Sequence, residues 1–137
     1  MTTIRIPAGN QHLECALDTT FSSVTVETAM CEATGENVTV SFQADVVDAD
    51  AYLTWLRTAL LALRPGTSWT HFQVVADERD TWMAHSTFRQ GGREVEQVVV
   101  QVMLGRGLAG IVWTGAKATL PNGQARALAI VRTLSLS

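Results

Sequence analysis

Apolar and polar residues alternate along the first third of the chain, which is typical of half-buried β-strands. The alternation runs from Leu13 to Leu17 and again from Val24 to Met30. After the turn residues Thr34-Gly35-Glu36, it continues from Val38 to Gln43. These segments predict a β-meander in which the third strand forms a hairpin with the second.

The middle of the chain changes to a helical spacing. Apolar residues recur at intervals of three and four from Tyr52 to Leu63, which predicts one long helix near residues 48–64. Asp48 or Asp45 can accept the free N–H groups at its start, and Pro65-Gly66 ends it.

Strand patterns and a last short element follow the helix. The strands are expected over residues 69–76, 82–90, 93–104 and 108–116, with Gly91-Gly92 closing a hairpin. Pro121 can begin a short helix that continues to Arg132, with a strand as the alternative, and residues 133–137 close as strand or tail. The chain is therefore predicted to be one α+β domain, residues 1–137, with a mostly antiparallel sheet of about six to seven strands.

Composition narrows the expected surroundings and partners. The chain has 137 residues, of which 47% are hydrophobic, so it can bury the core of one domain. Its formal net charge is −3 and its ten Lys and Arg residues are dispersed, which argues against a nucleic-acid partner. Its first residues lack a secretory-signal pattern, and no run approaches the roughly 18 apolar residues of a membrane span. We expect a cytoplasmic protein that is not embedded in a membrane.

The two cysteines, Cys15 and Cys31, are interpreted as structural residues. In a reducing cytoplasm they are expected to be small buried hydrophobes, with a disulfide as the alternative. No histidine stands at a metal-ligand spacing from either of them.

A glycine pattern at Gly105–Gly110 spells G-x-G-x-x-G, the form of a dinucleotide-binding loop. Such a loop must open a helix, but Ile111 to Thr114 are strand formers. Position 130, where an acid for the ribose is expected, is Ile. The glycines therefore predict a β-turn, and no nucleotide cofactor is expected.

The titratable residues form no catalytic set in the sequence. Three histidines stand apart from one another: His12, His71 and His85. His85 and Ser86 are neighbours on a strand, so they point to opposite faces and cannot pair as base and nucleophile. Glu94 and Glu96 share a strand face beside a hairpin, which favours a solvated edge over a catalytic carboxylate pair. We expect a protein without catalysis, metal or cofactor.

The strand predicted over residues 93–104 is apolar on both faces. One long helix can cover only one face of a sheet, so the second face needs another helix, a second subunit or a partner. That face mixes apolar side chains with hydroxyl and amide groups and can receive an apolar helix that carries small polar groups. The candidate partner-binding residues are Thr39, Ser41, Val95, Gln97, Val99, Gln101 and Met103.

Several stretches resemble the DcrB-like branch of the Mog/PsbP-like fold family. They are Tyr52–Leu56, Trp69–Phe72, Ala84–Arg93, Gln97–Val100, Ile111–Gly115 and Ala129–Leu136. The resemblance covers roughly residues 47–136. It implies an antiparallel sheet with helices packed mainly on one side and no catalytic apparatus.

Relatives without a signal peptide include the Eag chaperones of type VI secretion, which the resemblance implies hold apolar transmembrane segments of effectors against a sheet face, often as dimers. By analogy, we expect a chaperone or adaptor that binds an apolar segment of a partner such as a type VI secretion effector, and that can form a homodimer. Two alternatives stay open. One is an immunity or assembly protein that binds a folded partner through its loops. The other is a small-molecule binder or enzyme with a pocket between sheet and helix, and His71 or His85 as its polar contact.

Overall fold

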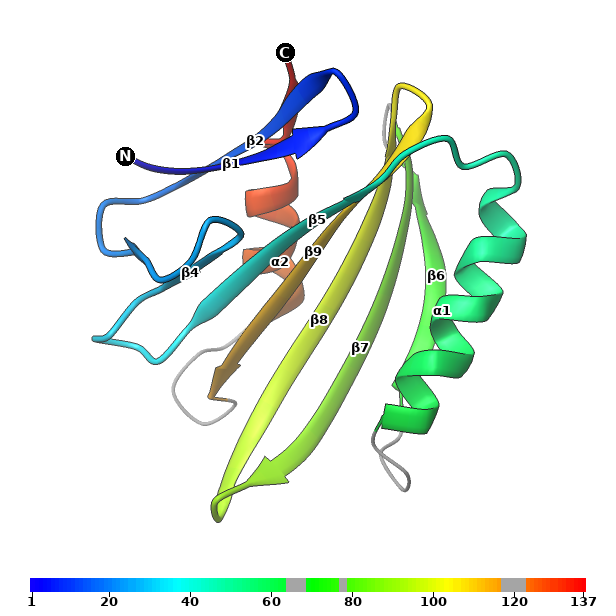
Figure 1. The fold of residues 1–137 in the computed structure, drawn as a ribbon. Coiled ribbons are helices and arrows are strands. Elements are labelled where there is room, and N and C mark those ends of the chain that lie inside the picture. Colours follow the sequence, from blue (N-terminus) through cyan, green and yellow to red (C-terminus); the bar gives the residue numbers. More distant parts are fainter. Residues whose placement is uncertain (64–68, 77–78, 117–122) are drawn as a thin grey trace.

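A computed structural model describes residues 1–63, 69–76, 79–116 and 123–137 of the chain (Figure 1). Arg64, Pro65-Gly66 and Pro121, which figure in the helix predictions, lie outside the described residues, as does the side chain of His71. The elements in chain order are β1 Thr2–Ala8, β2 Gln11–Leu17, β3 Ser22–Ser23, β4 Thr28–Met30, β5 Asn37–Gln43, α1 Ala49–Leu63, β6 Trp69–Ala76, β7 Asp80–Gln90, β8 Arg93–Leu104, β9 Gly107–Ala116, α2 Gly123–Val131 and β10 Ser135–Leu136.

The main sheet confirms the predicted α+β class. Its seven described strands run in the order β3-β4-β5-β9-β8-β7-β6, and every pairing is antiparallel. The hairpins β7–β8 and β8–β9 turn at Gly91-Gly92 and at Gly105, and all three glycines have positive φ. The G-x-G-x-x-G pattern is therefore a hairpin turn, as predicted, because glycine adopts these angles without steric cost.

A second, three-stranded sheet corrects the expected meander. Its order is β1-β2-β10, so β2 does not continue into the main sheet. Strand β1 was not predicted, although its buried Ile4 and Ile6 alternate with exposed Arg5. The chain end closes this sheet through mutual backbone bonds between His12 and Ser137. Burying the apolar side of β2 thus requires strands from both ends of the chain.

The strand predicted from Val24 to Met30 is wrong in its first half. Only Thr28–Met30 forms a strand, β4, which pairs with β5 as expected. Val24 and Val26 are 58% and 67% exposed and lie in a bend. Their alternation therefore does not reflect burial on one sheet face.

Helix α1 begins as predicted and ends within one residue of the predicted boundary. The carboxylate of Asp48 accepts a hydrogen bond from the backbone N–H of Ala51 at 3.1 Å, which identifies Asp48 as the N-cap in preference to Asp45. Helix α2 settles the open alternative for the C-terminal segment in favour of a helix.

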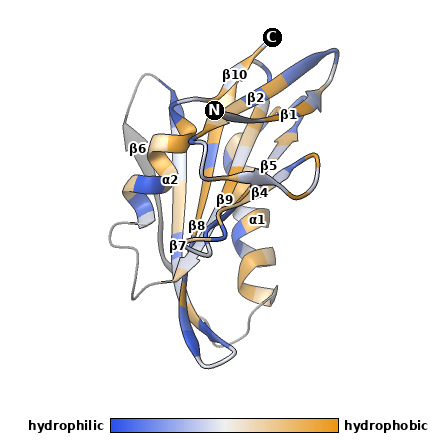
Figure 2. Cartoon of the chain, turned by 90° about the vertical axis from the view of Figure 1, so that its left-hand side faces the viewer, coloured by the Kyte–Doolittle hydropathy of each residue, from blue (hydrophilic) through white to orange (hydrophobic). Residues whose placement is uncertain are grey.

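The two helices lie on opposite faces of the main sheet (Figures 1 and 2). Helix α2 and the small sheet cover the face that carries Val38, Val100 and Trp113, and together they enclose the hydrophobic core. Helix α1 lies on the other face beside β6 and β7. The expectation that the helices pack mainly on one side is therefore wrong, because each sheet face has an apolar content that needs its own cover.

Candidate functional site

The candidate site is the main-sheet face on the α1 side, which we call the α1-side face. Directly paired residues of neighbouring strands point to the same side, so the register defines rows across β5, β9, β8 and β7. Two rows are polar, namely Ser41–Gly110–Gln101 and Asn37–Thr114–Gln97–Ser86. Between and beside them lie apolar rows, which are Val112–Val99–Ala84, Leu108–Met103 and Ala116–Val95–Phe88.

All seven predicted partner-binding residues lie on this face. Thr39 is opposite Val112 of β9, which is opposite Val99 of β8. In the same way, Ser41 is opposite Gly110, which is opposite Gln101. The remaining three, Val95, Gln97 and Met103, follow along β8 at even spacing. Sequence alternation was sufficient to group them because successive side chains of a strand alternate between faces.

Their exposure divides the seven into two groups. Val99 and Gln101 are buried, with only 2% and 6% of their surface exposed. Ser41 is exposed, whereas the others are half-buried: Thr39, Val95, Gln97 and Met103. The centre of the predicted surface is thus already covered within the chain, and a partner can reach the group toward β5 and the two ends of β8.

Figure 1 shows why this division arises. Helix α1 stands in front of β6, whereas neither described helix lies in front of β5 and β9. A hollow of about 290 Å³ separates α1 from the sheet and is lined by Asp50, Leu53, Thr54, Arg57 and Trp82. A partner can therefore reach the α1-side face at its β5 edge, which the helix leaves uncovered, and beside the hollow at Trp82.

Close packing of polar groups marks the row around Gly110. A Cβ atom at Gly110 would lie 2.6 Å from Ser41 Oγ and 2.7 Å from Gln101 Nε2. Glycine is required there because the two polar side chains of neighbouring strands converge over its backbone. They leave a shallow polar strip between apolar rows.

Hydroxyl groups line the same face. The hydroxyls of Thr28 and Thr39 are 3.1 Å apart, and Gln97 Nε2 donates to Thr114 Oγ1 at 3.2 Å. The hydroxyl of Ser86 is fully buried and has no hydrogen-bond partner among the described residues. Of the hydroxyls on this face, those of the exposed Ser41 and the half-buried Thr39 can be reached by a guest that brings its own polar atoms.

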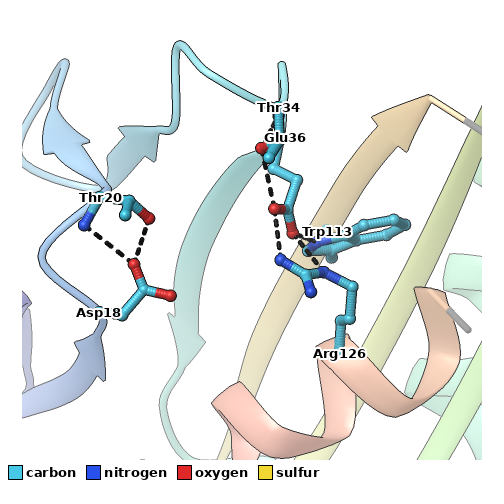
Figure 3. A network of polar contacts seen from close by, with 6 residues as sticks. All are labelled: Asp18, Thr20, Thr34, Glu36, Trp113 and Arg126. Carbon is cyan, nitrogen blue, oxygen red and sulfur yellow. Dashed lines mark hydrogen bonds and ion pairs between the residues drawn. The ribbon is translucent and has the colours of Figure 1, made fainter. Parts of the chain in front are cut away.

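A second polar cluster lies on the α2 side of the sheet (Figure 3). Glu36 is 1% exposed and accepts hydrogen bonds from Trp113 Nε1 at 2.9 Å, Arg126 Nε at 2.7 Å and Thr34 Oγ1 at 2.9 Å. Arg126 Nη2 also donates to Glu36, so the guanidinium binds the carboxylate in a bidentate manner. The cluster ties α2 to the start of β5 and to β9.

The cluster keeps both ions charged. Burial alone would raise the pKa of Glu36, but the donors from Arg126, Trp113 and Thr34 outweigh it, and the pKa lies below the ordinary value. The hydrogen bonds from Arg126 to Glu36 raise the pKa of the guanidinium in turn. The ion pair is thus a permanent link in the core at neutral pH.

An open hollow of about 250 Å³ lies beside this ion pair, between β2 and α2. It is lined by Ala16, Leu17, Asp18, Phe21, Glu36, Arg126, Ala129 and Ile130. His85, one of the two histidines proposed as polar contacts of a ligand pocket, is not among the described residues of this lining. Hydrogen bonds from Thr20 lower the pKa of the exposed Asp18 at its rim.

His85 and Glu96 form a pair that the sequence analysis missed. His85 Nε2 lies 2.6 Å from Glu96 Oε2, and their side chains are 17% and 12% exposed. Glu96 is thus not part of a solvated edge, because it packs against Gly123 at the start of α2. The signal was available in the hairpin: a tight turn at Gly91-Gly92 sets Thr87 opposite Glu96, with His85 one step diagonally away.

The two cysteines belong to the hydrophobic core. Cys15 and Cys31 are both buried free thiols, and burial raises the pKa of Cys15 to about 11. Hydrogen bonds, chiefly from Thr34, lower the pKa of Cys31. Within the described residues, no group of three or more His, Cys, Asp or Glu side chains could hold a metal ion.

Neither described helix, α1 or α2, has the length and hydropathy to cross a membrane. Helix α1 has 15 residues, fewer than the roughly 20 that a bilayer core requires.

Comparisons with known proteins relate this chain to others by fold. No protein-family model matches it, and no curated protein sequence matches it. LpqN, involved in cell envelope biogenesis of Mycobacterium tuberculosis, has a similar structure with a TM-score of 0.68 at 8% identity, over 99% of this chain and 91% of LpqN. PA94 of Pseudomonas aeruginosa, a protein of unknown function, has a TM-score of 0.52 at 14% identity, over 98% of this chain and 81% of PA94. The chain shares a related α+β fold with these two proteins.

Proposed function

We propose that this chain is a non-catalytic chaperone or adaptor that holds an apolar helix of a partner protein on the α1-side face. The observation that supports the proposal best is the alternation of polar and apolar rows on an accessible part of the sheet. A purely apolar guest would strip water from the exposed hydroxyl of Ser41 without replacing its hydrogen bonds, at a cost of about 1–3 kcal/mol. A guest helix with small polar groups among its apolar residues can pack against the apolar rows and form hydrogen bonds with the polar rows.

The apolar rows supply the attraction in this proposal. Burial of apolar surface contributes about 25 cal/mol per Å², so a few hundred Å² against Val112, Val95 and Met103 offset the loss of freedom on binding. The exposed Ser41 and the half-buried Thr39 lie at the β5 end of the surface and contribute orientation. A secreted effector with an apolar segment is a partner of this chemistry.

A synthetic helix tests the proposal without the natural partner. The probe is a fluorescent, Leu- and Ala-rich peptide that contains two serines and is held in mild detergent; binding is followed by fluorescence anisotropy. We expect saturable binding that weakens at least ~10-fold in Ser41→Arg, because the added charge must be desolvated beneath the guest.

Ser135→Arg is the matched control, since Ser135 is also an exposed strand serine but lies on β10 in the small sheet. It should bind the peptide as the unmodified chain does. Equal affinity of the two variants, or no binding by the unmodified chain, would refute the proposed surface.

A further inference from the structure

The outer side of α1 carries large apolar residues that the chain leaves uncovered. Trp55 is 62% exposed, Leu61 near the helix end is 44% exposed, and Val47 just before the helix is fully exposed. The exposed residues between them include the small, uncharged Ala51, Thr54 and Thr58. In Figure 2, the outer side of α1 is turned away from the sheet. Exposed apolar residues gathered on one helix face are typical of an interface.

Two charges border this outer side without an ionic partner. Asp50 and Arg57 are both exposed and take part in no ion pair within the portion of the chain that the structure describes. They are seven residues apart, or about 10.5 Å along the helix axis at 1.5 Å per residue, which is too far for them to pair with each other. They lie on the same flank of α1, as both line the hollow beside Trp82.

From this arrangement we propose that α1 joins two copies of the chain in an antiparallel, two-fold symmetric dimer. When the symmetry axis passes through Thr54, each residue lies opposite the one equally far from Thr54 on the second helix. Asp50 then lies within one residue of Arg57 of the other copy, and the symmetry forms this pair twice. The charge pattern of α1 is therefore complementary to itself when the helix is reversed.

The same axis matches the apolar residues. Val47 of one copy lies opposite Leu61 of the other, since both are seven residues from Thr54. The two Trp55 side chains meet beside the axis, where the tilted ring of Tyr52, 5.8 Å from Trp55 within each chain, supports them. Small residues around Thr54 let the helix backbones approach closely.

This interface is independent of the proposed partner-binding function. The dimer contacts lie on α1, along the flank that borders the hollow beside Trp82, and not on β5 or β9, so the β5 end of the α1-side face stays open in the dimer. A single helix pair buries less than the roughly 800 Å² per partner of a standard interface, and we expect a dissociation constant on the order of 10 µM.

Sedimentation equilibrium across that concentration range tests the dimer through charge exchange. Asp50→Arg and Arg57→Asp should each weaken association at least ~10-fold, since each change replaces two attractions by two repulsions. The double variant Asp50→Arg/Arg57→Asp should return to within ~3-fold of the unmodified chain because the pairs are restored in the opposite sense. Arg132→Asp, an exposed arginine on the far side of the sheet, should leave association unchanged.

Circular dichroism of each variant shows whether α1 still folds, and the double variant is an internal check because it contains both changes. The proposal is overturned if the unmodified chain sediments as a monomer at all concentrations. Dimerisation that is insensitive to the single charge reversals, or that the double variant fails to restore, overturns it equally.

Discussion

Replacing Arg126 by methionine removes the cation that compensates the buried Glu36 carboxylate. Breaking a fully buried ion pair in this way costs about 3–5 kcal/mol. The Arg126 side chain is 40% exposed, so water screens part of the interaction, whereas the Glu36 side chain is only 2% exposed. Trp113 and Thr34 still donate to the carboxylate. We therefore expect the free energy of unfolding to fall by about 2 kcal/mol at neutral pH.

The loss should depend on pH with a defined sign. In the unmodified chain the folded pKa of Glu36 is lowered, so its contribution to stability is present above the ordinary glutamate pKa and is lost as pH falls through the lowered value. Without Arg126, burial outweighs the remaining donors and the folded pKa rises. The contribution of Glu36 is then favourable only at low pH and is lost as pH increases. The difference between the two proteins is therefore largest at neutral pH and shrinks on acidification.

Urea unfolding followed by circular dichroism, at neutral pH and at a pH below the ordinary glutamate pKa, measures both effects. Arg132→Met is the matched control, because this arginine lies just after the same helix and is exposed. Arg126→Lys should fall between the two, since lysine keeps the charge but cannot form the bidentate pair. A loss below ~0.5 kcal/mol in Arg126→Met, or one that persists unchanged at acid pH, would refute the account of the Glu36 cluster.

Three further changes probe the packing. Gly123→Ala should destabilise the fold by about 1–3 kcal/mol, although alanine favours helices more than glycine does. The added Cβ would lie 1.9 Å from Glu96 Oε1 and 2.5 Å from the Trp113 ring, so one of these groups must move. A thermal melt in which the variant is more stable than the unmodified chain contradicts this prediction. Val99→Asp should leave the domain largely unfolded by circular dichroism, because this valine is 2% exposed; a folded variant would mean that the α1-side face opens. In the variant Cys31→Ser, Cys15 is the only thiol, and it should react with a thiol reagent at mildly alkaline pH only after urea is added. The reason is that Cys15 is buried and that burial raises its pKa to about 11. Rapid labelling of the native chain would disprove its burial.

Local sequence patterns determined much of the architecture. The spacing from Tyr52 to Leu63 predicted α1, and glycine pairs predicted both long hairpins, because helix periodicity and turn angles are properties of neighbouring residues. Alternation along residues 93–104 also grouped five of the seven candidate partner-binding residues on one face. The same reasoning failed at Val24 and Val26, where an alternating pattern has no sheet face to cover.

The tertiary structure decided which of these surfaces are accessible and which distant residues meet. Glu36 looked like a turn residue, and its partners Trp113 and Arg126 lie 77 and 90 positions away. Likewise, β10 joins the sheet of β1 and β2 only when the chain ends come together. Val99 belongs to the predicted face but is covered in the folded chain. Strand alternation states which side of a sheet a residue occupies; the packing of non-local elements decides what, if anything, covers that side, because burial depends on contacts that no local pattern encodes.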